Sequence, residues 1–259
     1  MITIIDGINA HHFQNLLKQS YALRARVFRD RLGWEVNVEN GMETDVFDTL
    51  NPTTLVSLDT SGRVVGSMRI LQTTGPNMLA DVFNAILQGE PAPRSPLIWE
   101  ATRLCVDTDR LSMTGCPRSK SSISYVTSEI MVAACEYAME AGVKDAVAVI
   151  DPLMNRVLKR SGNAPYDYLG APTAMGKVTA MAGLLDCSEE RVNRLRERSD
   201  IRGDVFLKES AAIEQHGDHK YLPSPSKADM SKYMSEQLQA AENTTDLKAT
   251  LKLIAELHK

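Results

Sequence analysis

Two strand-like segments joined by a short turn constrain the fold of this chain most strongly. Residues 54–59 (TLVSLD) and 63–71 (RVVGSMRIL) are rich in β-branched and aliphatic side chains, as strands usually are. Residues 60–62 (TSG) between them carry a turn signal, so the two segments predict an antiparallel hairpin. Because side chains alternate between the faces of a strand, we expect Arg69 to project from a largely buried surface.

The remaining periodic segments extend this hairpin into a sheet. Further strands are predicted at residues 2–5, 97–106, 145–150, 165–169 and 176–184, and helices at 10–32, 77–88, 119–141 and 152–161. This order predicts an α/β fold in which a mixed sheet carries helices on both faces. Residues 33–53 have no clean period and are expected to form a long loop, which in a compact domain is often functional.

The chain is expected to divide into two parts. Residues 1–187 contain the predicted sheet, and residues 188–259 are expected to form a helical C-terminal extension. Helices are predicted in this extension at 188–198, 226–241 and 245–258. The last is amphipathic, which favours packing on its own chain or on a second copy over binding another partner. The oligomeric state is left open.

Composition argues against two classes of function. The 259 residues carry a net charge of −4, whereas a dedicated nucleic-acid binder usually has a basic excess. No apolar run approaches the roughly 18 residues that a membrane span needs. The N-terminal sequence MITIIDGINAHHF lacks a basic segment followed by an apolar core, so no signal peptide is predicted. A cytoplasmic location is therefore expected.

The cysteine and histidine residues predict no metal site. Cys105, Cys116, Cys135 and Cys187 are widely spaced and form no C-x-x-C pair. Free thiols are the favoured interpretation in such a protein. The five histidines are scattered as well.

Arg24 is the most unusual residue of the first predicted helix. Arg24 lies within an apolar stripe, whereas Arg26 and Arg29 fall on other faces and are expected to be solvated. A buried arginine must find a carboxylate or a ligand, because an unpaired buried charge is costly. The stripe consists of Leu17, Tyr21, Arg24, Phe28 and Leu32.

Other charged and aromatic residues could complete a site with Arg24. Alternation along 97–106 places Glu100 and Arg103 on opposite faces unless a β-bulge intervenes. Each candidate also has a structural interpretation, as a loop cap, a strand-edge charge, a core phenylalanine or an ordinary ion pair. The candidates are Arg24, Phe28, Trp34, Asp45, Asp48, Arg69, Phe83, Glu100 and Arg103.

The order and spacing of these residues resemble one known family. R-x3-F-x5-W, then D-x2-D, then an arginine in SMRIL, then E-x-T-R is similar to the acyl-homoserine-lactone synthases, the LuxI-type autoinducer synthases. Matching segments are YALRARVFRDRLGW, GMETDVFDT, VVGSMRILQT, PNMLADVF and RSPLIWEATRLCV. The resemblance extends to about residue 185. It implies an N-acetyltransferase-like fold, a mixed twisted sheet splayed into a V-shaped cleft.

The resemblance also implies a reaction and roles for residues. Such enzymes transfer an acyl chain from acyl carrier protein, or from coenzyme A, to the amine of S-adenosylmethionine, close the lactone and release methylthioadenosine. S-adenosylmethionine is a substrate, so no cofactor is expected. Glu100 is expected to be the base. The implied catalytic group further includes Arg24, Asp45, Asp48, Arg69 and Arg103, and the implied S-adenosylmethionine contacts are Phe28, Trp34, Phe83 and Thr102.

The acyl donor raises further expectations. Many family members that make 3-oxo products carry a threonine where this chain has Ala148. This difference favours an unsubstituted acyl chain, or one whose oxo group is held elsewhere. Candidates for an apolar acyl tunnel are Met68, Ile70, Ile123, Val126, Met131, Val147, Val149, Leu153 and Met154. Five basic residues could form a rim that binds an acidic carrier protein, or could be ordinary surface charges of helices. They are Arg118, Lys120, Arg156, Lys159 and Arg160.

Two alternatives to this function stay open. A generic N-acyltransferase that uses coenzyme A would usually show a glycine-rich pyrophosphate loop, but residues 112–122 (SMTGCPRSKSS) contain one glycine. A non-catalytic module that senses acyl or adenosyl ligands would not require Glu100 in a cleft.

Overall fold

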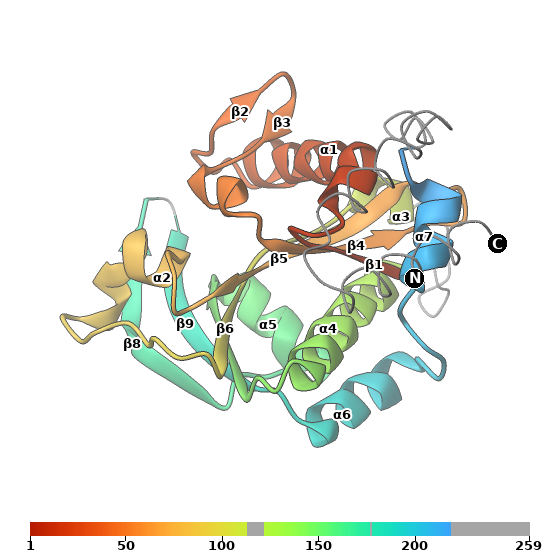
Figure 1. Ribbon diagram of the computed structural model, residues 1–259. Coiled ribbons are helices and arrows are strands. Elements are labelled where there is room, and N and C mark those ends of the chain that lie inside the picture. The colour runs from red at the N-terminus through yellow and green to blue at the C-terminus, as the bar shows by residue number, and fades with distance from the viewer. Residues whose placement is uncertain (113–121, 177, 219–259) are drawn as a thin grey trace, which may run out of the picture. The chain divides into compact units, whose positions relative to one another are not determined.

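A seven-stranded sheet organises the first 218 residues. The computed structural model describes residues 1–112, 122–176 and 178–218, and Met1–Asp218 form one compact unit. The strands run in the order β1-β4-β5-β6-β7-β9-β8 (Figure 1). Their bounds are β1 Ile2–Ile5, β4 Thr53–Leu58, β5 Val64–Gln72, β6 Ile98–Val106, β7 Asp145–Ile150, β8 Asp167–Met175 and β9 Val178–Asp186. The predicted hairpin is β4–β5, and the predicted α/β fold with a mixed sheet is confirmed.

The sheet opens between its two central strands. β6 and β7 are parallel neighbours, but they pair only along Ile98–Glu100 of β6 and Asp145–Val147 of β7. β6 continues to Val106 along β5, and β7 continues to Ile150 along β9. The later halves of the two strands therefore separate, which is the V-shaped opening that the family resemblance implied.

A β-bulge lies in β6 beside this opening. The β5–β6 register shifts between Ser67 and Arg69, so two residues of β6 oppose Met68 alone. Arg103 is one of these two and has a left-handed backbone, with φ of 54°. A bulge inserts one residue into the alternation. It thereby turns Arg103 toward the face that carries Glu100. Strand periodicity alone had placed these two residues on opposite faces unless a bulge intervened.

One face of the sheet is covered by α1 and the segment that follows it. The predicted helix 10–32 consists of η1 (Ala10–His12), α1 (Gln14–Arg24) and a π-helical turn, η2 (Ala25–Arg31). The predicted loop 33–53 contains a small hairpin, β2 (Val38–Glu39) with β3 (Met42–Glu43), and the 3-10 helix η3 (Val46–Leu50). Figure 1 shows α1, β2 and β3 together above the sheet.

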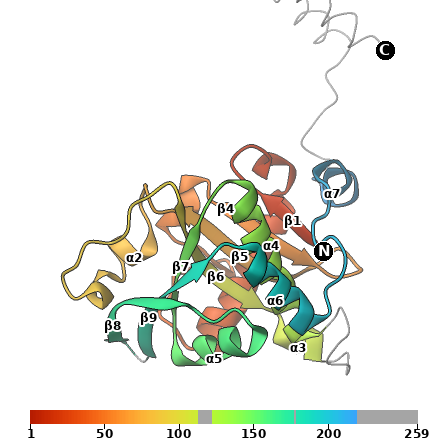
Figure 2. The ribbon, with the colours of Figure 1, turned by 90° about the horizontal axis from the view of Figure 1, so that it is seen from below.

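The other face is covered by helices from the second half of the chain. α4 (Ile123–Glu140) lies against this face, with α5 (Pro152–Ser161) and α6 (Glu189–Ser199) beside it (Figure 2). The predicted helix 77–88 is two short turns, α2 (Met78–Asp81) and η4 (Asn84–Leu87). A further short helix, α3 (Thr108–Ser112), follows β6.

The limit of the compact unit differs from the predicted boundary after residue 187. α6 packs on α4, and α7 (Glu209–His216) packs near β1. The backbone N–H of Ile2 donates to Val205 at 2.7 Å, and that of Leu207 donates to Ile2 at 2.8 Å. Residues 188–218 therefore belong to the compact unit, because they complete the edge beside β1. The helices predicted at 226–241 and 245–258 lie outside the described residues.

Within the described part of the chain, no helix is long and apolar enough to cross a membrane.

Candidate active site

Arg24 ends α1 pointing inward, as its place in the apolar stripe predicts. The residue is 2% exposed. Its Nε donates to Glu43 at 2.5 Å, and its Nη1 and Nη2 donate to the two oxygens of Asp48, each at 2.8 Å. This bidentate pairing is the strong geometry for a guanidinium and a carboxylate. Arg26 and Arg29 are exposed, as expected.

Arg69 reaches the same carboxylates from β5. It is 1% exposed and pairs with both oxygens of Asp45, at 2.5 and 2.8 Å. A further bond joins Nη1 to Asp48 at 2.8 Å, and Nε donates to the Thr102 hydroxyl at 3.1 Å. The predicted residues of three separate segments therefore meet at one point.

Arg103 completes the cluster from the bulge of β6. Its Nη2 donates to Glu43 at 3.1 Å and to Asp45 at 2.8 Å. Its Nη1 donates to the thioether sulfur of Met78 at 3.4 Å, and thioethers are weak acceptors. The guanidinium also lies 5.6 Å from the centre of the Phe28 ring. Nη1 is therefore the donor of this cluster that a stronger acceptor can most easily recruit.

The cluster balances its charges. Three guanidinium groups (Arg24, Arg69, Arg103) face three carboxylates (Glu43, Asp45, Asp48). Burial opposes the ionisation of Asp48, but hydrogen bonding and the charge of Arg24 outweigh it and lower the pKa of Asp48 to about 2. Among the described residues, no group of three or more metal-ligating side chains is arranged to hold a metal ion.

Glu43 was not among the predicted site residues, although it is fully buried and contacts two of the arginines. The signal was the charge count, because three inward arginines require a third carboxylate. Asp45 and Asp48 are also the capping residues of η3: Asp45 accepts from the Phe47 N–H, and Asp48 accepts from the Asp45 N–H. The local capping role and the site role coexist.

Aromatic rings flank the cluster on two sides. Phe28 stacks on Trp34, with ring centres 5.1 Å apart and planes inclined by 18°. Phe83 packs elsewhere, beside Phe47 and Met78 near α2. The structure therefore brings Phe28 and Trp34 together next to Arg103 and places Phe83 on the α2 side.

Glu100 is held next to the cluster by α2. The residue is 0% exposed, and its oxygens accept the backbone N–H groups of Met78 and Leu79, both at 2.7 Å. Burial raises the pKa of Glu100 to about 7, although the two N–H groups and the charge of Arg69 act in the opposite direction. A carboxyl with such a pKa can exchange a proton near neutral pH.

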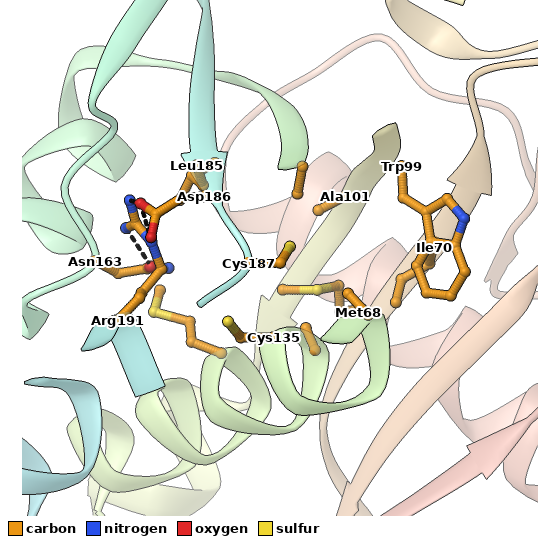
Figure 3. Close-up of a pocket in the computed structure, with 14 residues that line it drawn as sticks. Met68, Ile70, Trp99, Ala101, Cys135, Asn163, Leu185, Asp186, Cys187 and Arg191 are labelled. Atoms are coloured by element: carbon orange, nitrogen blue, oxygen red, sulfur yellow. Dashed lines mark hydrogen bonds and ion pairs between the residues drawn. The ribbon is translucent and has the colours of Figure 1, made fainter. Parts of the chain in front are cut away.

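An apolar cavity of about 60 Å³ lies on the other face of the sheet, against α4. Trp99 and Ala101, which flank Glu100 in β6, face this cavity. Asn163, Asp186 and Arg191 form one end, and Trp99 and Ile70 lie at the other (Figure 3). The lining is Met68, Ile70, Trp99, Ala101, Met131, Ala134, Cys135, Ala138, Ala146, Asn163, Leu185, Asp186, Cys187 and Arg191.

Three of the residues predicted for an acyl tunnel line this cavity. Met68, Ile70 and Met131 line it, whereas the other predicted tunnel residues do not. Ala148 lies two residues along β7 from the lining residue Ala146, so both side chains belong to the same face of the strand.

Three of the five residues predicted for a basic rim lie in the described part of the chain. Arg156, Lys159 and Arg160 are exposed on α5. Arg118 and Lys120 lie outside the described residues.

Comparisons with known proteins identify the family and the fold of this chain. The model of the autoinducer synthase family matches residues 9–195. A probable acyl-homoserine-lactone synthase of Sinorhizobium fredii is 37% identical over 181 residues, which cover 70% of this chain and 85% of the relative. The crystal structure of the AHL synthase LasI superposes with a TM-score of 0.64 at 29% identity, covering 79% of this chain and 98% of that one.

A second solved structure is a CoA-dependent acyl-homoserine lactone synthase, BjaI, with SAM and isopentyl-CoA. It superposes with a TM-score of 0.67 at 25% identity and covers 83% of this chain and 98% of that one.

Proposed function

This chain belongs to the autoinducer synthase family, and we propose that its two-sided site joins an acyl chain to S-adenosylmethionine across the opening of the sheet. The enzyme is an acyl-homoserine-lactone synthase, an acyltransferase. One observation carries the assignment of the site: Glu100 and the arginine–carboxylate cluster occupy one face of β6, and the apolar cavity occupies the other.

S-adenosylmethionine is assigned to the face that carries the cluster. Its carboxylate can take the Nη1 donor of Arg103, replacing the weak thioether contact. Its sulfonium or adenine can lie against the stacked Phe28 and Trp34 rings, by cation–π or stacking contact. Asp45, Asp48 and Glu43 hold the arginines in place, since each carboxylate is already paired.

Glu100 is assigned as the base. The substrate amine must lose a proton before its lone pair can attack the thioester carbonyl carbon. A carboxyl with a pKa of about 7 is ionised in a large fraction of molecules at neutral pH. Glu100 takes one proton from the ammonium group, directly or through one water, and the neutral amine then forms the C–N bond. As the C–S bond of the thioester breaks, the nitrogen loses its second proton, which balances protonation of the leaving thiolate.

Lactone closure follows from the same substrate pose. The carboxylate oxygen attacks the γ-carbon that carries the sulfonium, a C–O bond forms, and the C–S bond breaks to release methylthioadenosine. Because the sulfonium is a good leaving group, this step requires mainly orientation. No resident cofactor or metal is included in the proposal.

The acyl chain is assigned to the cavity against α4. Its walls are largely alanine, methionine, isoleucine and leucine, which suit an alkyl chain. Ala148 supplies no hydroxyl for a 3-oxo group, so an unsubstituted chain is proposed. The donor is proposed to be acyl carrier protein, which is acidic, because Arg156, Lys159 and Arg160 are exposed together on α5. Such substrates imply a cytoplasmic location.

The test is product formation from defined substrates. Purified protein is incubated with S-adenosylmethionine and matched acyl-carrier-protein and acyl-CoA donors of several chain lengths. The expected products are methylthioadenosine and an acyl-homoserine lactone in equal amounts, identified by mass. Acylation of amines without methylthioadenosine release would indicate a generic N-acyltransferase, and binding without turnover would indicate a sensing module.

A further inference from the structure

The turn that forms α2 holds both oxygens of Glu100, and we infer that Asn77 and Asp81 are positioning residues that fix this turn and so tune Glu100 as the base. The inference rests on the proposed function for its catalytic part. Neither residue belongs to the arginine–carboxylate cluster. Their contribution would come through the backbone N–H groups of Met78 and Leu79.

The contact between α2 and Glu100 is specific. The first N–H groups of a helix have no partner inside the helix. Two of them, on Met78 and Leu79, each take a different oxygen of Glu100 at 2.7 Å. Hydrogen bonds to an ionised group are stronger than neutral ones. The position of this turn therefore decides how well the ionised form of Glu100 is stabilised.

A turn of four residues cannot hold its own shape. One helical turn fixes many dihedral angles for few hydrogen bonds, so α2 depends on other anchors. Asn77, which is 1% exposed, caps it: its Oδ1 accepts from Ala80 at 3.0 Å, and its Nδ2 donates to the carbonyl of Gly75 at 3.0 Å. The Asn77 N–H donates to Asp81 at 2.9 Å. Asn77 and Asp81 thus close the turn on itself and tie it to the preceding loop.

The turn is also tied to the arginine cluster. The sulfur of Met78 accepts from Arg69 at 3.3 Å and from Arg103 at 3.4 Å. The same residue therefore contacts Glu100 through its backbone and two arginines through its side chain. This contact sets the side of α2 that faces the site.

The charged groups around Glu100 shift its pKa in opposite directions, so the direction of a shift can test the proposal. Arg69 on β5 lowers the pKa of Glu100, and Asp81 on α2 raises it. Arg103 follows on the same strand but is paired with Glu43 and Asp45. Toward β7, the residue opposite Glu100 is the uncharged Val147. Asp81 is therefore the acidic neighbour whose charge can be removed without breaking the arginine cluster.

Two substitutions should move the pKa of Glu100 in opposite directions. Asn77→Ala removes the cap and loosens the two N–H donors that favour the carboxylate, so the pKa should rise. Asp81→Asn keeps an oxygen acceptor for the Asn77 N–H but removes a nearby negative charge, so the pKa should fall. A rise of about one pH unit, a tenfold change in the ionisation constant, is expected for Asn77→Ala. A smaller fall is expected for Asp81→Asn, because Asp81 is exposed and solvent screens its charge.

The direct measurement is an infrared titration of the protonated Glu100 carboxyl in the full-length protein. The band is assigned by its absence in Glu100→Gln. Asn84→Ala and Asp200→Asn, at exposed positions outside this turn, are the matched controls and should leave its midpoint unchanged. Midpoints that stay fixed in both test variants, or that move in the same direction, would overturn the inference.

The kinetic measurement follows the acid limb of kcat/KM for methylthioadenosine release. The amine of S-adenosylmethionine titrates identically in all variants, so only Glu100 can shift this limb between them. Asn77→Ala should lower kcat about tenfold, and Asn77→Ser, which keeps a capping oxygen, should restore most of it. A loss of kcat with an unmoved acid limb would indicate a merely structural role.

The two measurements separate this inference from the proposed function. If no variant releases methylthioadenosine, and the wild type does not either, the proposed function fails. The infrared titration still decides the role of the turn.

Discussion

Among single residues, Glu43 carries the charge balance of the buried cluster. Glu43→Gln would leave three guanidinium groups facing two carboxylates in a site where Glu43 is fully buried. Removing one partner of a buried ion pair costs about 3–5 kcal/mol of stability. We expect a loss of that order in the free energy of unfolding, measured by urea denaturation at pH 7. Glu39→Gln, exposed in the same small hairpin, is the control and should change it by no more than about 0.5 kcal/mol.

Glu100 carries the proton transfer in the proposed reaction. Glu100→Gln has no basic oxygen to accept a proton from the amine, so kcat/KM for lactone formation should fall by about 10²–10⁴-fold. Glu35→Gln, an exposed substitution of the same kind, should retain activity. The measurement is methylthioadenosine release, with folding checked by circular dichroism. Unchanged output from Glu100→Gln would remove Glu100 from the role of base and leave the family assignment intact.

Sequence patterns predicted some of the residues of this site but not others. Arg24 could be placed inward because it interrupts an apolar stripe at helical spacing, and the structure confirms it. Glu43 could not be placed in the same way, because it lies in a segment with no period. The sequence motif therefore contained the arginines and two of the three carboxylates. The charge count calls for a third carboxylate, and the tertiary contacts identify it as Glu43.

Among the elements, β6 shows why periodicity alone could not complete the site. Strict alternation puts Glu100 and Arg103 on opposite faces, but the bulge with the left-handed Arg103 brings them to one. A bulge depends on the partner strand, so the sequence of β6 alone does not specify it. α4 and most strands were predicted close to their observed bounds, since periodic segments need no such information. The strand predicted at 165–169 covers only the start of β8, which continues to Met175 through an irregularity in its pairing with β9.

A substitution in α4 can test whether the apolar cavity sets the length of the acyl chain that the enzyme accepts. Ala138, 3% exposed, lines the apolar cavity, and Ala138→Leu would fill part of it. We expect kcat/KM to fall most for the longest accepted acyl donor and least for short donors, because only long chains need the filled space. The measurement is a series of donors of increasing length. Ala141→Leu, exposed at the end of the same helix, should leave the series unchanged, and a uniform loss across all lengths in Ala138→Leu would contradict the assignment of the cavity.

For the whole molecule, the raised pKa of Glu100 predicts how stability depends on pH. A carboxyl whose pKa rises from 4.5 to about 7 on folding binds more protons in the native state. Stability is then lost as the pH rises through this window, by about 3 kcal/mol at 1.36 kcal/mol per unit. Asp48, whose pKa is lowered to about 2, acts in the opposite sense and only at more acidic pH, so the two effects separate.

The comparison that isolates this effect is between the wild type and Glu100→Gln. Gln cannot titrate, so the variant lacks this loss of stability. Between pH 4.5 and pH 8 the unfolding free energy of the wild type should therefore fall by about 3 kcal/mol relative to that of the variant. Urea denaturation at closely spaced pH values measures it. All other carboxyls are common to both proteins and cancel in the difference. A difference that stays constant over this range would mean that folding does not shift the Glu100 pKa, and the burial that suits Glu100 to act as a base would then need another explanation.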